Sequence, residues 1–120
     1  MDLAVTERAD GVVIVDVGGS VDVYTASDLR NGLDAQIHHG HTRMVIDLRD
    51  VDFLDSTGLG VLVARLKLVR SHSGWLRLVC SDDKILRVFR ITGLDKVFHI
   101  HDTLDAALEN GDPSHAADGD

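Results

Sequence analysis

One short stretch of the chain, VDFLDSTGLG from Val51 to Gly60, holds the residues best suited to chemistry. Either Asp55 or Ser56 can cap the start of a helix, and both choices put the Ser56 hydroxyl beside free backbone N–H groups. Capping alone is one interpretation of this serine. Gly58 and Gly60 favour a second, because a glycine inside a helix costs roughly 1 kcal/mol relative to alanine. Two glycines in the first turns therefore indicate that another backbone or a partner comes close.

The neighbours of Ser56 do not complete the motifs of enzymes that use such residues. A hydrolase nucleophile needs Gly-x-Ser-x-Gly, but Leu54 stands where the first glycine would be. An acid protease needs Asp-Ser/Thr-Gly, and the run from Asp55 to Gly58 is one residue too long. Val63 replaces the last glycine of a dinucleotide fingerprint, and no Gly-Lys-Ser/Thr phosphate loop occurs. Asp47 resembles a phospho-accepting aspartate, but no acidic pair follows the first strand. The sequence therefore argues against each of these enzyme classes.

The seven histidines do not form a recognisable metal motif. His38, His39 and His41 gather at the end of a predicted helix, where solvated polar or positive side chains are common. His99 and His101 share one side of a predicted strand, but no cysteine or carboxylate stands at ligand spacing. We expect no metal and no cofactor.

Length and charge narrow the class of protein. The 120 residues, 44% of them hydrophobic, suit one domain with its own core. Twelve basic against twenty acidic residues give a net charge of −8, the wrong sign for binding nucleic acid. No apolar stretch approaches the roughly 20 residues of a membrane span, and Asp2, Glu7 and Arg8 break any signal-peptide pattern. The single cysteine, Cys80, fits a reducing compartment. We expect a cytoplasmic protein without nucleic acid or membrane partners.

Hydrophobic periodicity predicts strands and helices in alternation. Two strands joined at Asp10-Gly11 form an N-terminal β-hairpin that ends at Gly18-Gly19. Helices between the later strands imply crossover connections, so we expect an α/β fold with a mixed, mostly parallel β-sheet and helices packed on it. The domain is expected to span residues 1–110, with a disordered acidic C-terminal tail at 111–120. The elements expected after the hairpin are a helix opened by Thr25 with Asp28 and closed by Gly40, a buried parallel strand at Met44–Leu48, a buried helix at Leu59–Val69, a strand at Trp75–Cys80, a helix opened by Ser81, Asp82 and Asp83 and closed by Gly93, a strand at Val97–Ile100, and a helix from Thr103 to Leu108.

Three motifs in a fixed order give the chain a family resemblance. They are Gly19-Ser20-Val21-Asp22 with Thr25-Ala26, Asp55-Ser56-Thr57-Gly58-Leu59-Gly60, and Ile91-Thr92-Gly93-Leu94 with Val97-Phe98. In these motifs, over roughly residues 2 to 109, the chain resembles the STAS-domain anti-sigma factor antagonists, the anti-anti-sigma factors of bacterial partner-switching systems. The resemblance implies a single STAS domain and a regulator of transcription, in stress response or development, rather than an enzyme.

The resemblance also implies a switch by phosphorylation. The family's acceptor is the residue straight after the motif aspartate, which is Ser56 here, and Thr57 is the adjacent alternative. The unphosphorylated form is expected to bind an anti-sigma factor that is itself a serine kinase, with ATP and Mg²⁺ bound to the kinase, and so to free the sigma factor. Phosphorylation is expected to break that complex, and a PP2C-type phosphatase to restore it. The partner-binding residues that the resemblance carries over are Asp22, Thr25, Asp52, Asp55, Ser56, Thr57, Gly58, Leu59 and Gly60.

The acidic residues around Ser56 supply a physical reason for such a switch. Phosphate adds a charge of about −1.5 to −2 and is favoured at a helix N-terminus, so we expect the fold to tolerate it. Asp50, Asp52 and Asp55 crowd the same segment, and Arg49 alone is expected to oppose them. New negative charge is then expected to disrupt a contact built for a small hydroxyl.

Two questions stay open at this point. Asp22 is expected to end a neighbouring strand near Ser56, where it either belongs to the partner surface or only caps the turn at Thr25. Related domains also occur in transporters and sensors, so a STAS-type small-molecule or nucleotide-binding sensor module is the alternative function.

Overall fold

A computed structural model describes residues 1–109, and the expected tail at 111–120 lies outside these described residues. Strands and helices alternate along most of this part, after two strands at its start. The elements in chain order are β1 (Asp2–Glu7), β2 (Val13–Val21), α1 (Ala26–His38), β3 (Arg43–Leu54), α2 (Ser56–Ser71), β4 (Trp75–Val79), α3 (Asp83–Ile91), the 3-10 turn η1 (Leu94–Lys96), β5 (His99–His101) and α4 (Leu104–Glu109).

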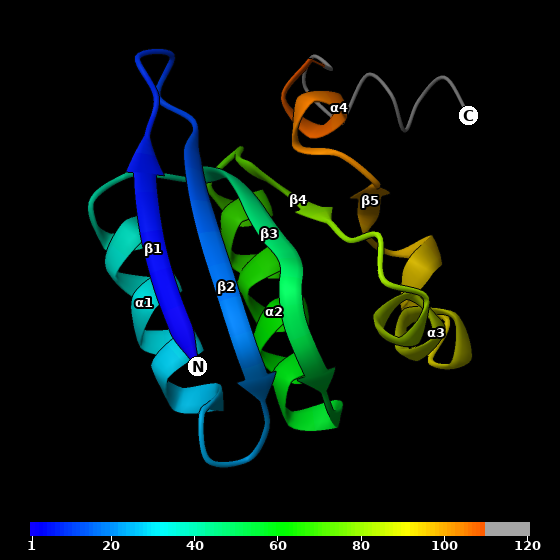
Figure 1. The fold of residues 1–120 in the computed structure, drawn as a ribbon. Coiled ribbons are helices and arrows are strands. Elements are labelled where there is room, and N and C mark those ends of the chain that lie inside the picture. Colours follow the sequence, from blue (N-terminus) through cyan, green and yellow to red (C-terminus); the bar gives the residue numbers. More distant parts are fainter. Residues whose placement is uncertain (110–120) are drawn as a thin grey trace.

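Within the described residues the strands form one five-stranded sheet in the order β1-β2-β3-β4-β5 (Figure 1). β1 pairs antiparallel with β2, and every later pair is parallel. The turn between β1 and β2 contains Asp10 and Gly11, and Gly11 adopts a φ of 86°, a left-handed conformation that glycine reaches without steric cost. The predicted α/β fold, with a mixed, mostly parallel sheet and an N-terminal hairpin, is confirmed.

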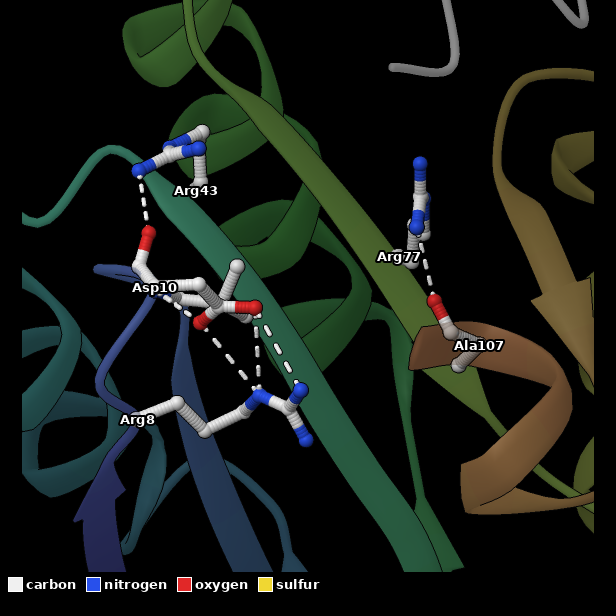
Figure 2. Close-up of polar contacts among 6 residues, drawn as sticks. Arg8, Asp10, Arg43, Arg77 and Ala107 are labelled. Atoms are coloured by element: carbon white, nitrogen blue, oxygen red, sulfur yellow. Dashed lines mark hydrogen bonds and ion pairs between the residues drawn. The ribbon is translucent and has the colours of Figure 1, made fainter. Parts of the chain in front are cut away.

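Side chains around Asp10 fasten the hairpin turn to the start of the central strand (Figure 2). Arg8 Nε lies 3.3 Å from Asp10 Oδ1, and Arg43 Nη2 donates a hydrogen bond to the Asp10 carbonyl oxygen at 2.7 Å. Arg43 opens β3. Because β2 and β3 run parallel, this contact lies at the opposite end of the sheet from their carboxyl ends.

Helices α1, α2 and α3 pack on one face of the sheet and make the main core with it. In Figure 1, α1 and α2 lie side by side behind β1, β2 and β3. Each helix turns its apolar side inward, as the spacing of its apolar residues predicts. Buried residues of this core include Leu29 and Leu33 of α1, Leu62 and Leu66 of α2, Ile85 and Phe89 of α3, and Val15, Ile46 and Leu78 of the sheet.

Helix α4 covers part of the opposite face. Val45 and Val79 alternate along their strands with the residues of the main core, so their side chains point to the other side of the sheet, where Ala107 of α4 is fully buried beside them. Arg77 is only 2% exposed and donates from Nη1 to the Ala107 carbonyl oxygen at 2.7 Å (Figure 2). Its guanidinium carbon lies 3.9 Å from the centroid of the Trp75 ring. A buried arginine thus fastens α4 to the sheet.

Strand β2 continues beyond its predicted end. The strand was expected to end at Gly18-Gly19, but it runs to Val21. Its pairing with β3 shifts register between Asp16 and Gly18 and again between Gly19 and Ser20, and Gly19 adopts a φ of 85°. The two glycines therefore mark irregularities inside the strand rather than its end.

Strand β3 is also longer than predicted. It was expected at Met44–Leu48, but it runs from Arg43 to Leu54 and leaves only Asp55 before α2. Val51 and Leu54 are buried, whereas the residues between them are exposed. Only one side of this half of the strand is buried, so its residues do not form a continuous apolar run. The prediction relied on such a run and therefore ended the strand too early.

The last strand is shifted along the chain. A strand was expected at Val97–Ile100, but the segment first forms η1 and then β5 at His99–His101. Phe98 is buried between them, with its ring centroid 5.8 Å from that of Phe89 in an edge-on contact. The apolar character of Phe98 therefore reflects packing at the end of η1 rather than strand pairing, whereas Val97 is 40% exposed.

Candidate functional site

The predicted site lies where β2 and β3 end side by side. Val21 and Leu54 are paired across these strands, and the Asp55 N–H donates to the Val21 carbonyl oxygen at 3.2 Å. The turn that follows β2 and the start of α2 therefore meet at the carboxyl ends of parallel strands, where α/β folds often bind partners and ligands. This arrangement brings Asp22 next to the segment that carries Ser56, as predicted.

Asp55, and not Ser56, caps α2. One Asp55 side-chain oxygen, Oδ1, accepts hydrogen bonds from the Thr57 N–H at 3.0 Å and from the Gly58 N–H at 3.2 Å. Ser56 is the first residue of the helix, it is exposed, and its hydroxyl makes no hydrogen bond with any other described residue. The serine hydroxyl is thus free at the positive end of a 16-residue helix.

The start of α1 differs from the predicted capping box. The Thr25 hydroxyl donates to the Ser20 carbonyl oxygen at 2.8 Å, and Thr25 makes no side-chain cap to its own helix. Asp22 holds the turn instead: its Oδ1 accepts from the Tyr24 N–H at 2.9 Å and from the Thr25 N–H at 3.1 Å. Asp28 makes none of these contacts. Asp22 lies four residues before the first residue of α1, and its side chain holds the turn that leads into the helix, a contact that the spacing of Thr25 and Asp28 does not predict.

Arg49 does not oppose the acidic residues beside Ser56, contrary to the prediction. Its Nη2 lies 2.6 Å from Oδ2 of Asp47, a carboxylate that is only 4% exposed. Burial by itself would raise the pKa of Asp47, but the hydrogen bonds from the Arg49 side chain and backbone hold that pKa below its ordinary value. Burial and the neighbouring Asp47 carboxylate raise the pKa of Asp16, which lies opposite on β2.

The acidic residues near Ser56 are consequently without a basic partner. Asp52 Oδ1 accepts a hydrogen bond from the Ser20 hydroxyl at 3.0 Å. Within residues 1–109, no lysine, arginine or histidine lies within ion-pair distance of Asp22, Asp52 or Asp55. The potential around the Ser56 hydroxyl is therefore set by carboxylates and the helix terminus.

The two motif glycines of α2 have different surroundings. A Cβ added to Gly58 would lie 2.7 Å from Leu54 Cδ1 and 2.7 Å from Val21 Cγ1, both in the core. A Cβ added to Gly60 would meet no heavy atom within 4 Å. Gly58 is thus required by packing inside the chain, and no described residue requires Gly60. Leu59 is only 4% exposed, so its side chain packs in the core rather than on the exposed surface of the site.

Exposed apolar side chains around the site were not predicted from the sequence. Val23 is 64% exposed, Tyr24 is 86% exposed and Phe53 is 50% exposed. They lie in the turn after β2 and at the end of β3, at the same end of the sheet as Ser56. Large exposed apolar groups beside polar ones are typical of protein interfaces. We call the exposed residues at this end of the sheet the Ser56 surface: Val23, Tyr24, Asp52, Phe53, Ser56 and Thr57.

The single cysteine, Cys80, is not a reactive thiol. Cys80 is buried, and burial raises the pKa of its thiol, which opposes formation of the reactive thiolate. Among residues 1–109, no three or more histidine, cysteine, aspartate or glutamate side chains are arranged to hold a metal ion. In the same part of the chain, no helix has both the length and the apolar character needed to cross a membrane.

Comparisons with known proteins agree on one family. The sequence profile described as "STAS domain" matches residues 4–107. The chain is 40% identical over 86 residues to an anti-sigma-B factor antagonist of Bacillus subtilis (strain 168), covering 72% of this chain and 78% of that protein. It is 35% identical over 97 residues to the protein of the same name from Staphylococcus aureus (strain NCTC 8325 / PS 47), covering 81% of this chain and 90% of that protein. The crystal structure of an anti-sigma factor antagonist from Mycobacterium paratuberculosis superposes with a TM-score of 0.82 at 35% identity, covering 90% of this chain and 91% of that one.

Proposed function

This chain belongs to the STAS domain family and is an anti-sigma factor antagonist, and from that premise we propose that it binds a cognate anti-sigma factor through the Ser56 surface. By the cognate anti-sigma factor we mean the one from the same organism that forms a complex with the wild-type chain. A protein of this class is a regulator rather than an enzyme. Binding removes the inhibitor from its sigma factor, so the chain promotes sigma-dependent transcription.

Phosphorylation of Ser56 is the switch in this proposal. The observation that carries it is the unused, exposed Ser56 hydroxyl at the first position of α2, whose cap is supplied by Asp55. A kinase can reach such a hydroxyl without unfolding the helix. The cognate anti-sigma factor is the proposed serine kinase, with its own bound ATP and Mg²⁺, and Thr57 is the adjacent alternative acceptor. This chain contributes the acceptor oxygen and no catalytic group.

The phosphate weakens the complex through charge. It adds about −1.5 to −2 beside Asp22, Asp52 and Asp55, which already lack basic partners among the described residues. The helix N-terminus stabilises an anion by roughly 0.3–1 kcal/mol, so the isolated protein tolerates the modification. A complementary partner surface built for a hydroxyl must accommodate the new charge and its hydration, and binding is lost. Removal of the phosphate by a PP2C-type phosphatase restores binding.

A sensor of small molecules is less well supported. A cavity of about 880 Å³ lies beside β5 and is lined by the cationic side chains of Arg90 and Lys96 together with His99 and His101. Asp95 and Asp102 line the same cavity and offset its positive charge. The cavity therefore has no strong preference for an anionic ligand, and the protein-binding function is the one we adopt.

Kinase assays test the phosphorylation step directly. The chain is incubated with purified anti-sigma factors of its organism, ATP and Mg²⁺, and the phosphate is mapped by mass spectrometry. We expect one phosphate on Ser56, lost in Ser56→Ala and retained in Thr57→Ala. Phosphate on Thr57, or within α3, contradicts the assignment.

Substitutions at the acceptor test the binding step. Ser56→Ala is expected to bind the cognate anti-sigma factor and to resist modification, whereas Ser56→Asp is expected to bind poorly because its carboxylate imitates part of the phosphate charge. Both variants keep the Asp55 cap, so both should unfold at temperatures close to that of the wild type. Equal binding by the two variants contradicts the switch.

A further inference from the structure

An apolar groove begins at Ser56 and runs along the exposed side of α2. Its volume is about 420 Å³, and Thr92 and Leu94, which follow α3, line its other side. The α2 residues that line it include Ser56, Gly60, Val63 and Lys67, which recur at the spacing of a single helix face. At 1.5 Å per residue this face is about 16 Å long. The phosphorylation site therefore lies at one end of a groove that is three helical turns long.

Nothing in the described chain fills this groove. The missing Cβ of Gly60 leaves space that no heavy atom within 4 Å occupies, and Ala64, one turn further on, is exposed. Gly58, by contrast, is required by the packing of Leu54 and Val21. Packing among residues 1–109 therefore does not account for the glycine at position 60.

The chain's own C-terminus is poorly suited to cover the groove. α4 ends the described residues at Glu109 and packs on the face of the sheet opposite to α2. Residues 110–120, NGDPSHAADGD, have two alanines as their only hydrophobic side chains apart from the proline ring. Such a segment offers little apolar surface to bury against Val63 and Leu94.

The charges at the groove differ from those of the molecule as a whole. The chain has a net charge of −8, but the charged residue that lines the groove, among those the structure describes, is the cation Lys67. Lys67 pairs with no carboxylate of the described residues. A partner segment with acidic residues beside an apolar face is complementary to this arrangement.

We propose that the groove receives an amphipathic helix of the cognate anti-sigma factor, with its apolar face on Gly60 and Ala64 and its acidic flank toward Lys67. The inference rests on the proposed function and adds to it the anchor of the complex. A helix is the natural occupant of an apolar groove about three turns long between two helical segments. A phosphate on Ser56 blocks one end of the groove, so the same modification that repels the partner electrostatically also prevents its helix from seating.

A matched pair of substitutions tests the groove. Ala64→Leu fills it, and Ala35→Leu adds the same side chain at an exposed position of α1, away from the groove. The affinity of each variant for the purified cognate anti-sigma factor is measured by titration calorimetry, with thermal unfolding as the check on folding. We expect Ala64→Leu to weaken binding at least tenfold and Ala35→Leu to change it less than twofold, with both variants folded.

Charge reversal tests the acidic flank of the proposed helix. Lys67→Glu is expected to weaken binding at least fivefold at low salt, with a smaller difference near 1 M salt, where the Debye length falls to about 3 Å. Lys84→Glu, on the exposed side of α3 and outside the groove, is the control and is expected to bind within twofold of the wild type.

The outcomes separate this proposal from the proposed function. If the wild type binds and Ser56→Asp does not, but Ala64→Leu binds like the wild type, the groove assignment is wrong and the switch at Ser56 stands. If Ala64→Leu alters self-association of the chain and leaves binding of the cognate anti-sigma factor unchanged, the groove belongs to a second copy and the proposal is overturned. If the wild type binds no anti-sigma factor, the proposed function fails and this inference fails with it.

Discussion

Asp55 and Ser56 divide two tasks at the start of α2. The Asp55 carboxylate accepts the N–H groups of Thr57 and Gly58, so the helix is capped without the serine. A serine that also served as the cap would be committed to the helix, and its phosphorylation would disturb a bond worth about 1 kcal/mol. Because Asp55 supplies the cap, the proposed phosphorylation of Ser56 would leave the start of the helix intact.

Alanine substitutions at the two motif glycines should have opposite effects on stability. Gly58→Ala introduces a Cβ 2.7 Å from buried atoms of Leu54 and Val21, and we expect it to lower the free energy of unfolding by about 1–3 kcal/mol. Gly60→Ala meets no atom within 4 Å, and we expect a gain of up to about 1 kcal/mol from helix propensity. Urea unfolding of the two variants measures both values. A loss of stability at both positions would show that Gly60 is also needed by the chain itself.

The Asp16–Asp47 pair makes stability depend on pH. Folding raises the pKa of Asp16, so the ionised carboxylate destabilises the folded state. This loss of stability grows as the pH rises above the ordinary pKa of a carboxyl group, and it disappears as the pH falls below that pKa. Asp16→Asn removes the like charge opposite Asp47, so we expect a gain of about 0.2–1 kcal/mol at pH 7. Thermal unfolding between pH 3 and pH 8 should show that gain disappear toward low pH. A gain that is independent of pH would mean that the charge of Asp16 is not its cause.

At the scale of elements, α4 depends on one arginine for its place on the sheet. Arg77→Ala removes the hydrogen bond to the Ala107 carbonyl oxygen and the contact with Trp75, and it leaves a buried polar group without that donor. We expect the free energy of unfolding to fall by about 1–3 kcal/mol and amide exchange to quicken in residues 104–109.

Arg87→Ala is the matched control for Arg77→Ala, because Arg87 is exposed on α3. It should change stability by less than about 0.5 kcal/mol. Unchanged exchange in α4 of Arg77→Ala would mean that apolar packing around Ala107 alone holds this helix.

The elements that could be predicted are those whose apolar pattern is decided by burial. α1, α2 and α3 each have one apolar side, and the core of β3 is a continuous apolar run, so their order and the α/β fold follow from the sequence. Helix ends and exposed strand ends are decided by single polar contacts instead. The end of β2 before Asp22 and the exposed end of β3 at Phe53 carry no apolar periodicity, and the predicted ends of both strands were wrong.

In the candidate site too, some features could be predicted from the sequence and others could not. Ser56 could be found because a motif names it, and the proximity of Asp22 because the carboxyl ends of parallel strands share one edge. The pairing of Arg49 with Asp47 could not be found, since any of the neighbouring aspartates was an equal partner in the sequence. The exposure of Tyr24 could not be found either, because an isolated aromatic residue gives no sign of the face it occupies.

At the scale of the whole molecule, charge is divided between two parts of the chain. Residues 1–55 contain eleven acidic and four basic residues, whereas residues 56–110 contain six acidic and eight basic residues. Ser56 lies at the boundary, between the acidic ends of β2 and β3 and the groove that holds Lys67. In the proposed switch, a phosphate there would extend the acidic part into the groove and so affect both parts of the proposed partner surface.

The affinity of the phosphorylated chain for the cognate anti-sigma factor tests the central claim most directly. The chain is phosphorylated to completion at Ser56, and its dissociation constant is compared with that of the unmodified chain and of the same sample after phosphatase treatment. Like charge placed in an interface costs several kcal/mol, so we predict binding roughly 100-fold weaker or more, restored in full by dephosphorylation. Equal affinity of the phosphorylated and unmodified chains would contradict the account.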